Sequence, residues 1–518
     1  METLDVLVVG AGPTGLVMAS ELLLHGAAVR LIEARRDRLD QSRAPGIQPR
    51  SLELFDRRGL ARELISRGES VRRFVRYAPG HKPVEITLDM GARDTRFPAM
   101  LMVSQTETED ILERHLASLG GKIEREVTLT GLRQETDGVD ATVRHADGNE
   151  ELIRVRYLVG ADGIRSTVRH LLEVPFAGES YPQSFLLADL AIDGPLEPGA
   201  FHMFVDPRGI AGFLPLQRPA PWRIIALERE APPEEAPAPT LDDIRQVAAW
   251  TGLPLRFDDP VWISRFRVHL RMAAQFRRGR VFLAGDAAHV HSPAGGQGLN
   301  TGIGDAWNLG WKLALVAQGQ APDELLDSYE AERMPVARFV LRFTDRMFSV
   351  MVSSGPLPTL LRRAVTPSAT SLLGRSRTLR HRVFRNTSQL GIEYRRSPIV
   401  AGTARRLRPR AGERLPDVKL PEGKGWLHEL LDGPGHHLLV CQGPSDPERL
   451  TQLARRYQGL VTVVRPPEGT LGSGLVLVRP DGYVAFRGTD DLAALEGYLA
   501  RRLRPAGDAD MNSATHGR

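Results

Sequence analysis

The sequence predicts an α/β fold, in which a domain with a parallel sheet is interrupted by a mostly antiparallel β-sheet and followed by a smaller α/β unit. Three observations support this prediction. The chain opens with an apolar strand, a glycine-rich turn and an apolar helix over residues 4–24. Residues 180–271 contain successive short strand patterns, and strands mix with helices again after about residue 412. Alternating strands and helices indicate a parallel sheet, whereas successive strands indicate an antiparallel one.

The composition limits the class of protein. Hydrophobic residues make up 42% and charged residues 25% of the 518 positions, which is typical of a globular chain of two or three domains. The net charge is only +5 and arginines are spread along the chain, so we expect no nucleic-acid partner. No uncharged apolar run approaches the ~20 residues that span a bilayer, so we expect no membrane segment. The single cysteine, Cys441, excludes a cysteine-rich metal site, and we expect a cytoplasmic protein without a metal.

The first strand leads into a dinucleotide-binding fingerprint. Gly10-Ala11-Gly12-Pro13-Thr14-Gly15 follows the strand directly and opens the first helix, and Glu33 ends the second strand 18 positions after the last glycine. Such a Rossmann-type turn holds a pyrophosphate at the helix N-terminus, and the carboxylate accepts hydrogen bonds from a ribose. NAD and FAD share this fingerprint, and a turn kept only for tight packing is the alternative. The candidate cofactor-binding residues are Gly10, Gly12, Thr14, Gly15 and Glu33.

Further cofactor contacts are expected along the first 130 residues. Residues 41–50 are rich in proline and glycine and carry Arg43, which could pair with a pyrophosphate, and Arg50. Gln105 stands at a predicted helix start, where its amide offers both a donor and an acceptor, and Val127 begins a predicted strand. For the arginines, a solvated surface position is the alternative.

Two later stretches carry similar chemistry. Residues 157–160 form a buried strand that ends in Asp162-Gly163, and Asp162 is a candidate for cofactor contact, with a plain Asp-Gly turn as the alternative. Residues 281–311 combine a strand, Asp286 beside Gly285, and three glycines before Leu299-Asn300. Asp286 could hold a hydroxyl of the cofactor, and the glycine-rich turn could hold an anion or a ring edge through backbone amides. An ordinary strand, loop and helix is the alternative.

Histidines and aromatic residues in these regions allow other interpretations. His289 and His291 have a spacing that suggests metal or acid–base chemistry, but we expect His289 to be packed and hydrogen-bonded. Four apolar residues on the predicted antiparallel sheet could roof an apolar substrate, although core packing is the simpler role for each of them. They are Phe201, Met203, Phe213 and Trp222.

Together the three motifs resemble the class A FAD-dependent aromatic hydroxylases, the group that includes para-hydroxybenzoate hydroxylase. The resemblance covers nearly the whole chain and is closer to the aromatic polyketide hydroxylase and rifampicin monooxygenase branch, because the C-terminal segment resembles a thioredoxin-like domain without a CxxC motif. It implies a Rossmann-type FAD-binding domain at 1–70, 103–178 and 272–396. A substrate-binding sheet at 71–102 and 179–271, a thioredoxin-like domain at 397–504 and a disordered tail at 505–518 complete the predicted organisation.

The resemblance also implies a mechanism. FAD would contact Arg43, Gln105, Asp162 and Asp286, with Gly298, Leu299 and Asn300 along the isoalloxazine ring. NADPH or NADH would reduce the flavin, O2 would add to give a C4a-hydroperoxide, and a polycyclic, polyketide-type aromatic substrate would be hydroxylated.

For catalysis we expect Pro293 in the wall beside the reacting oxygen and Arg50 stabilising negative charge. Baeyer–Villiger oxygenation, epoxidation and a non-catalytic polyketide-binding flavoprotein are the alternatives. A monomer or homodimer that serves antibiotic biosynthesis or detoxification is expected.

Overall fold

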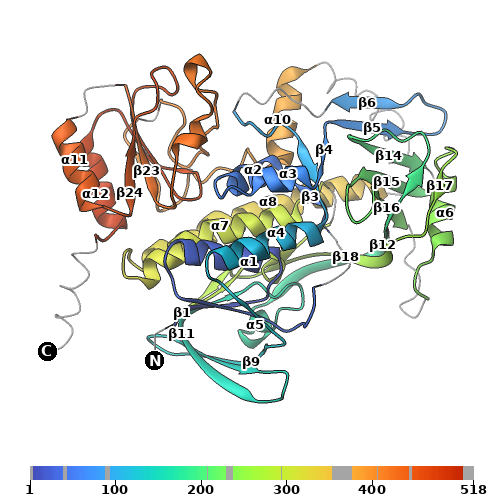
Figure 1. The fold of residues 1–518 in the computed structure, drawn as a ribbon, viewed down its shortest axis with the longest axis horizontal. Helices are drawn as coiled ribbons and strands as arrows, with labels where there is room; N and C mark the ends of the chain where they lie inside the picture. Colours follow the sequence, from blue (N-terminus) through green and yellow to red (C-terminus); the bar gives the residue numbers. More distant parts are fainter. Residues whose placement is uncertain are drawn as a thin grey trace.

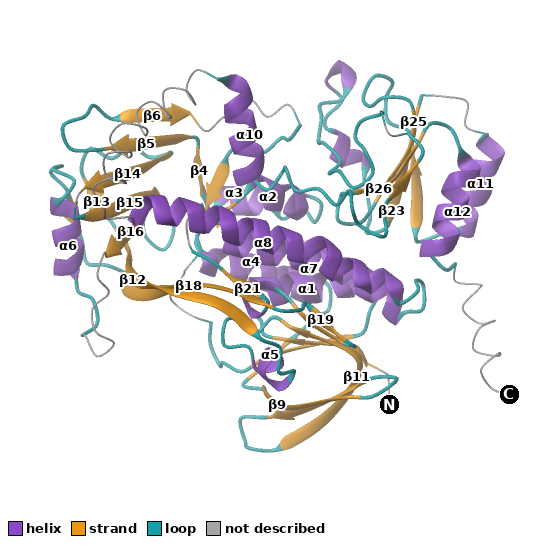
Figure 2. Ribbon diagram, turned by 180° about the vertical axis from the view of Figure 1, so that it is seen from behind, coloured by secondary structure: helices purple, strands orange, loops and turns teal. Residues whose placement is uncertain are grey.

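The computed structural model describes residues 4–38, 44–87, 94–206, 208–228, 237–292, 295–352, 376–404, 406–442 and 446–505. It has three regions, with the antiparallel sheet and the C-terminal α/β unit on opposite sides of a central region of long helices over a sheet (Figure 1). The same arrangement is seen from behind (Figure 2). The mixed α/β class, with an antiparallel sheet inserted into the central region, is confirmed.

The central sheet has the strand order β19-β20-β11-β1-β2-β8, and its middle strands are parallel. Helices α1, α4 and α7 cover one face (Figure 1). Strands β1 and β20 and the C-terminal end of β11 are buried and largely apolar, as in a parallel sheet that is covered on its faces, whereas the edge strands β8 and β19 carry charged residues. The bounds are β1 Leu4–Val9, β2 Val29–Glu33, β8 Ile123–Arg125, β11 Glu150–Gly160, β19 Arg277–Arg278, β20 Val281–Leu283, α1 Pro13–Leu24, α4 Gln105–Ser118 and α7 Gly298–Ala317.

Short elements complete this region. Strands β9 Thr128–Gln134 and β10 Val139–Arg144 extend the sheet as an antiparallel meander beside β11. Strands β3 Gly46–Ile47, β4 Glu69–Val71 and β7 Met100–Met102 form a separate small sheet. The remaining helices are α2 Pro49–Asp56, α3 Ala61–Ser66, α5 Thr167–Leu171, α8 Glu324–Val352 and α10 Arg377–Thr387, with the 3-10 turn η1 Gly285–Ala287.

The second sheet has the order β21-β18-β12-β16-β15-β14-β5-β6. Every pairing in it is antiparallel except that of β5 with β14. One face packs on α6 Leu241–Ala249, with the strand pair β13 Ile192–Asp193 and β17 Arg256–Phe257 nearby, and the other faces the central region. Its strands are β5 Arg73–Tyr77, β6 Val84–Thr87, β12 Phe176–Leu190, β14 Ala200–Asp206, β15 Gly209–Pro215, β16 Trp222–Glu228, β18 Trp262–Ala273 and β21 His289–Val290.

The C-terminal unit has a five-stranded sheet in the order β22-β26-β25-β23-β24. Helices α11 and α12 lie on it, which confirms the predicted alternation of strands and helices (Figure 1). Residues 506–518, where the disordered tail is predicted, lie outside the described residues. The bounds are β22 Ala401–Gly402, β23 His436–Cys441, β24 Val461–Val464, β25 Gly474–Val478, β26 Val484–Gly488, α11 Pro447–Arg456 and α12 Leu492–Arg502, with the 3-10 turns η2 Pro421–Gly423 and η3 Leu427–Leu430.

A cluster of buried charges joins this unit to the central region. Arg479, from the C-terminal sheet, places Nη1 2.6 Å from Oε1 of Glu332 on α8. Nζ of Lys312 on α7 lies 2.8 Å from the other oxygen of Glu332, and Asp481 also accepts from Arg479. Lys312, Glu332 and Arg479 have no exposed side-chain surface. We call this cluster the seam.

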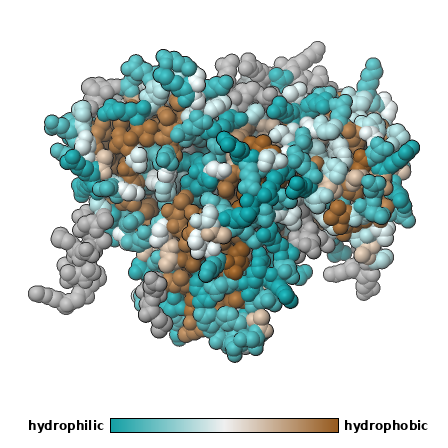
Figure 3. Space-filling view, in the orientation of Figure 1, coloured by the Kyte–Doolittle hydropathy of each residue, from teal (hydrophilic) through white to brown (hydrophobic). Residues whose placement is uncertain are grey.

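No helix in the described residues is long and apolar enough to cross a bilayer. On the face shown in Figure 3, hydrophobic residues gather in separate patches between hydrophilic ones.

Candidate active site

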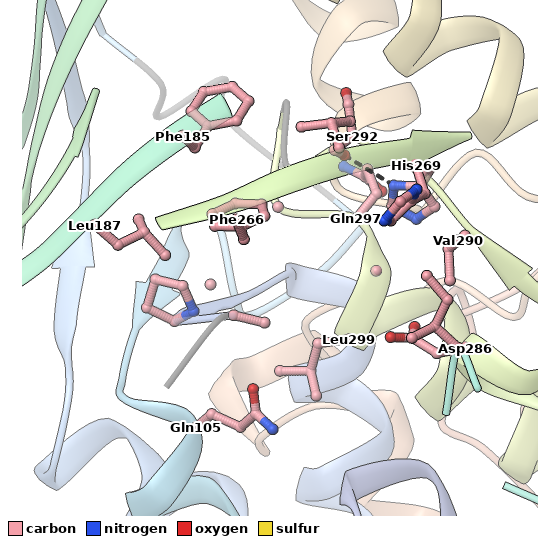
Figure 4. Close-up of a pocket in the computed structure, with 18 of the residues that line it drawn as sticks. Gln105, Phe185, Leu187, Phe266, His269, Asp286, Val290, Ser292, Gln297 and Leu299 are labelled. Atoms are coloured by element: carbon pink, nitrogen blue, oxygen red, sulfur yellow. Dashed lines mark hydrogen bonds between the residues drawn. The ribbon is translucent and has the colours of Figure 1, made fainter. Parts of the chain in front are cut away.

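A cavity of about 2090 Å³ lies between the carboxyl ends of the central strands and the second sheet. Its size exceeds the roughly 300–1,000 Å³ of an ordinary small-ligand pocket, so it can hold more than one molecule. In the close-up, Phe185, Leu187 and Phe266 lie on one side of it and Gln105 and Leu299 on the other (Figure 4). Ligands in open α/β sheets bind at this edge because loops, rather than covering helices, form it.

The glycine turn after β1 divides into packing and lining positions. A Cβ on Gly10, whose φ is +101°, would lie 2.5 Å from the carbonyl oxygen of Ala161, and one on Gly15 would lie 1.8 Å from the carbonyl oxygen of Gly10. Gly12, the N-cap of α1, has nothing within 4 Å of such a Cβ and lines the cavity. Gly15 does not line the cavity and packs tightly against the Gly10 backbone, and its contact with a cofactor stays a prediction.

Thr14 joins two distant parts of the chain at this turn. Its hydroxyl would lie 2.6 Å from a Cβ on Gly285 and 2.4 Å from one on Gly302, so both positions must lack a side chain. Thr14 also lines the cavity. The role of Gly302 is not predicted from the sequence, because a glycine within a helix has no local signature of close helix packing.

Glu33 lies at the cavity edge at the end of β2. Its Oε2 accepts a hydrogen bond from the backbone N–H of Ala11 at 2.9 Å, which ties it to the glycine turn. The backbone N–H of Val127 donates to the Glu33 carbonyl at 3.1 Å, and Gln105 Nε2 donates to Glu109 at 2.8 Å. Glu33, Val127 and Gln105 all line the cavity, as a cofactor contact requires.

Two aspartates line the cavity from different strands. Asp162, after β11, accepts from the backbone N–H of Val168 in the first turn of α5 at 3.1 Å, and burial raises its pKa. Asp286 lies in η1 with an exposed side chain. Both border the cavity, and Asp286 lies beside Val290 (Figure 4). These positions agree with the two predicted roles but do not demonstrate them.

The start of α7 presents Gly298 and Leu299 to the cavity, but not Asn300. The Asn300 amide is committed elsewhere: Oδ1 accepts from the Gln48 N–H, and Nδ2 donates to the carbonyls of Gly46 and Gly296, each at 2.8 Å. Asn300 ties the start of α7 to β3 and α2. The Asn300 side chain therefore positions this segment, and the contact of Asn300 with the flavin ring stays a prediction.

Arg50 also differs from the prediction. Its guanidinium donates to Glu53 Oε2 at 3.0 Å and to the Asp481 carbonyl at 2.5 Å, and it lies over the Tyr483 ring. It faces the C-terminal unit and does not line the cavity. This placement argues against a catalytic role for Arg50, because its guanidinium is bound to Glu53 and Asp481 away from the cavity. Arg43 and Pro293 lie outside the described residues.

The two histidines of the 281–311 stretch have different environments. His289 Nε2 lies 2.7 Å from Asp305, whose other oxygen accepts from Arg333 at 2.7 Å, so His289 is packed and hydrogen-bonded as predicted. His291 lines the cavity, and burial lowers its pKa to about 4. Its Nδ1 lies 3.0 Å from the Ser292 carbonyl, and its buried Nε2 has no hydrogen-bond partner. Since a carbonyl only accepts, Nδ1 carries the proton and Nε2 is an acceptor.

The second sheet supplies the apolar wall. Phe201 and Met203 line the cavity as predicted, whereas Phe213 and Trp222 pack on the opposite face in the core beneath α6. The alternation of side chains along each strand explains the difference. The wall also contains residues that the sequence did not single out, namely Phe74, Arg76, Met100, Met102, Leu214, Arg223 and Ile225.

These residues fit an extended dinucleotide. Gly12 leaves open space where a side chain would project, two carboxylates stand at strand ends, and His291 has an unpaired acceptor in the wall. In the described residues no group of histidine, cysteine and carboxylate side chains could hold a metal ion. Fold and site therefore define a dinucleotide-binding protein whose cavity also has room for a second, apolar ligand.

Comparison with known proteins agrees with this class. Residues 3–344 match the family model described as FAD binding domain, and residues 408–506 match that described as aromatic-ring hydroxylase, C-terminal. The chain belongs to this family of FAD-dependent aromatic-ring hydroxylases. The resemblance and the FAD cofactor predicted from the sequence are confirmed.

Individual relatives span nearly the whole chain. The 6-methylpretetramide 4-monooxygenase of Streptomyces rimosus is 36% identical, over 93% of this chain and 90% of its own. A rifampicin monooxygenase of Streptomyces venezuelae is 38% identical, over 94% of this chain and 96% of its own. The solved structure of OxyS anhydrotetracycline hydroxylase from Streptomyces rimosus superposes with a TM-score of 0.78 at 33% identity, over 97% of this chain and 99% of its own.

Proposed function

We propose that this flavoprotein uses NADPH or NADH to hydroxylate a polycyclic, polyketide-type aromatic compound. The observation that carries the proposal is the cavity, which combines a cofactor-binding edge with a wide aromatic and aliphatic wall. The similar proteins named above act on tetracycline precursors and rifampicin, which are large polycyclic molecules, and this supports the substrate class.

FAD, when bound and reduced by a nicotinamide cofactor, supplies the activation of O2 and the transfer of one oxygen atom. The chain supplies binding, orientation and the exclusion of water. Leu187, Phe185 and Phe266 form an apolar wall that would exclude water, since they carry no polar side-chain group. Glu33 and Asp286, which line the cavity, would accept hydrogen bonds from cofactor hydroxyls. His291 stays neutral above about pH 4, so it accepts a hydrogen bond and does not serve as an acid.

The test measures NADPH oxidation by the purified FAD-loaded protein with a panel of polycyclic phenols and quinones. We expect substrate-stimulated oxidation and a product heavier than the substrate by one oxygen atom. The position of the new oxygen, determined by NMR, separates hydroxylation from ring insertion and epoxidation. The absence of stimulated oxidation with every compound that binds would favour a non-catalytic binding protein.

A matched variant tests the site itself. Asp286→Asn keeps the shape of the side chain but removes the charge at the cavity edge. We expect about 10-fold or greater loss of FAD affinity, the usual scale for a charge-assisted hydrogen bond. Fluorescence titration of the apoprotein with FAD measures it. Asp345→Asn, on α8, serves as the control because Asp345 accepts from Tyr181 and does not line the cavity.

A further inference from the structure

The wall of the cavity contains a continuous row of side chains across five strands. Leu187 pairs with Ile225, Ile225 with Gly212, Gly212 with Met203, and Met203 with Arg76. All five residues line the cavity. Cross-strand neighbours on one face of a sheet stand side by side, so the row is one surface. It begins in aliphatic side chains and ends in a guanidinium.

The middle of this row, at Gly212, is covered by the side chains of its neighbours. A Cβ on Gly212 would lie 2.8 Å from the Phe201 ring and 3.0 Å from Ile225, so any side chain there would displace them. Phe201 meets Phe74 edge to face, with 5.3 Å between ring centroids. A flat aromatic molecule suits this surface, because the Phe201 and Phe74 rings that line it favour offset or edge-to-face ring contacts.

Arg76, at one end of the row, has no carboxylate partner in the described part of the chain. Its buried Nε makes no hydrogen bond, and burial lowers its pKa with no opposing charge. Asp206, which also lines the cavity, pairs with Arg208 at 2.6 Å. A cation in a partly buried apolar wall is costly unless a ligand supplies negative charge.

Arg223 lies toward the other end of the wall, and its charge is already neutralised. Its Nε and Nη2 donate to the two oxygens of Asp189 at 2.6 Å each. Nη1 is buried without a partner, although Arg223 lines the cavity and is only 1% exposed. Arg223 therefore offers a neutral ion pair with one unused donor, which suits a carbonyl or hydroxyl oxygen rather than an anion.

We propose that Arg76 and Arg223 select and orient the substrate, with Arg76 binding an ionised phenol or enol and Arg223 binding an uncharged oxygen at the other end of a fused-ring molecule. Their strands, β5 and β16, are three strand intervals apart, or about 14 Å, which suits a fused system of roughly four rings with an oxygen at each end. The inference rests on the proposed function, because it names the substrate chemistry of the same cavity.

The test measures binding to the FAD-loaded protein by calorimetry, with a hydroxyanthraquinone and its O-methyl ether as probes. We expect the wild-type protein to prefer the free phenol by about 10- to 100-fold, the scale of one charge-assisted hydrogen bond. Arg76→Gln should reduce the preference to within about threefold. Arg73→Gln is the matched control, since Arg73 lies on the same strand and pairs with Glu85 and Glu197 instead of lining the cavity.

A second pair of probes tests Arg223. A hydroxyanthraquinone is compared with a hydroxyanthracene that lacks the carbonyls, in the wild type and in the double variant D189L/R223M, which leaves no buried charge behind. The double variant should lose the preference for the carbonyl compound by about 3- to 10-fold, and Arg76→Gln should keep it.

The proposal is overturned if Arg76→Gln retains the preference for the free phenol, or if Arg73→Gln loses it equally. Loss of both preferences in Arg76→Gln alone would also contradict separate roles. Because binding is measured without turnover, the result is independent of catalysis. Tight, oriented binding without NADPH oxidation would sink the proposed function and leave this inference standing.

Discussion

The cavity and the seam both bury charged side chains, but they satisfy them differently. In the seam, Glu332 accepts from Lys312, Arg479, Asn308 and Ser397 at 2.6–2.9 Å. In the cavity wall, Arg76 Nε, Arg223 Nη1 and His291 Nε2 have no hydrogen-bond partner among the residues that the structure describes. A buried polar group without a partner costs free energy that a ligand can recover. The charges of the seam therefore stabilise the fold, whereas the polar groups of the cavity wall are available to bind a ligand.

Removing Arg479 from the seam should have the largest effect. Arg479→Met removes one of the two cations that pair with Glu332 and leaves Asp481 without its cation, so we expect the free energy of unfolding to fall by about 3–5 kcal/mol. Urea denaturation measures it. Arg449→Gln, which breaks an exposed pair with Glu496 in the same unit, should change it by less than about 1 kcal/mol. Similar losses in both variants would show that the seam is not special.

The glycine turn allows the same contrast within one motif. Gly15→Ala places a Cβ 1.8 Å from a backbone oxygen and should destabilise the apoprotein by about 3 kcal/mol. Gly12→Ala meets no protein atom, so the apoprotein should keep its stability while FAD affinity falls by about 10-fold or more. Thermal unfolding and FAD titration of both variants separate packing from binding. If Gly12→Ala binds FAD normally, the cofactor does not approach this turn.

Asp417, in the C-terminal unit, pairs with Arg96 and should make the free energy of unfolding depend on pH. Burial raises its pKa to about 6, although Arg96 Nε lies 2.9 Å away. A carboxyl whose folded-state pKa is raised contributes stability below its unfolded pKa, near 4, and loses it as pH rises through about 6. Wild type should therefore lose about 2 kcal/mol of unfolding free energy between pH 4.5 and pH 7 relative to Asp417→Asn, which cannot titrate at this position. An equal difference at both pH values would contradict this assignment.

Arg57 lies near the seam but, unlike the seam residues, has no partner in the described residues. Its replacement should give the smallest change in unfolding free energy, and that change should be stabilising. All three of its guanidinium nitrogens are buried without a partner, and burial lowers its pKa to about 9. Arg57→Met should raise the free energy of unfolding by about 1 kcal/mol, because an apolar side chain carries no desolvation cost. A destabilised variant in urea denaturation would mean that a bound anion or water partners Arg57.

Local patterns predicted the strand ends and turns well. The positions of Gly12, Glu33, Asp162 and Asp286 at one cavity follow from strands that end in glycine or acidic residues, since parallel strands bring their carboxyl ends to one edge. Their contacts with FAD remain predictions. The sheet face was half predicted: Phe201 and Met203 face the cavity, but Phe213 and Trp222 do not, because an apolar strand buried on both faces does not reveal which one meets the ligand.

The arginines could not be predicted because their roles depend on tertiary contacts. Arg50 was expected near the flavin, yet its partner is the Asp481 carbonyl in another unit. No local pattern distinguishes Arg76 and Arg223 from the other arginines, which occur in every segment of the chain. Arg76 lacks a carboxylate partner in the described residues, whereas Arg223 pairs with Asp189. Neither fact can be known until the strands are paired.

The threonine after the first glycine turn has an implication for how such sequences are inherited. Thr14 packs where Gly285 and Gly302 lack side chains, and Gly10 packs against Ala161. The glycine turn after β1 thus packs against the segments around Ala161 and Gly285, although these lie far apart in the sequence. A larger residue in any of the three would displace the others. Recombination that brings one motif from a distant relative would therefore fail unless the other two came with it, so the three should be gained and lost as a set.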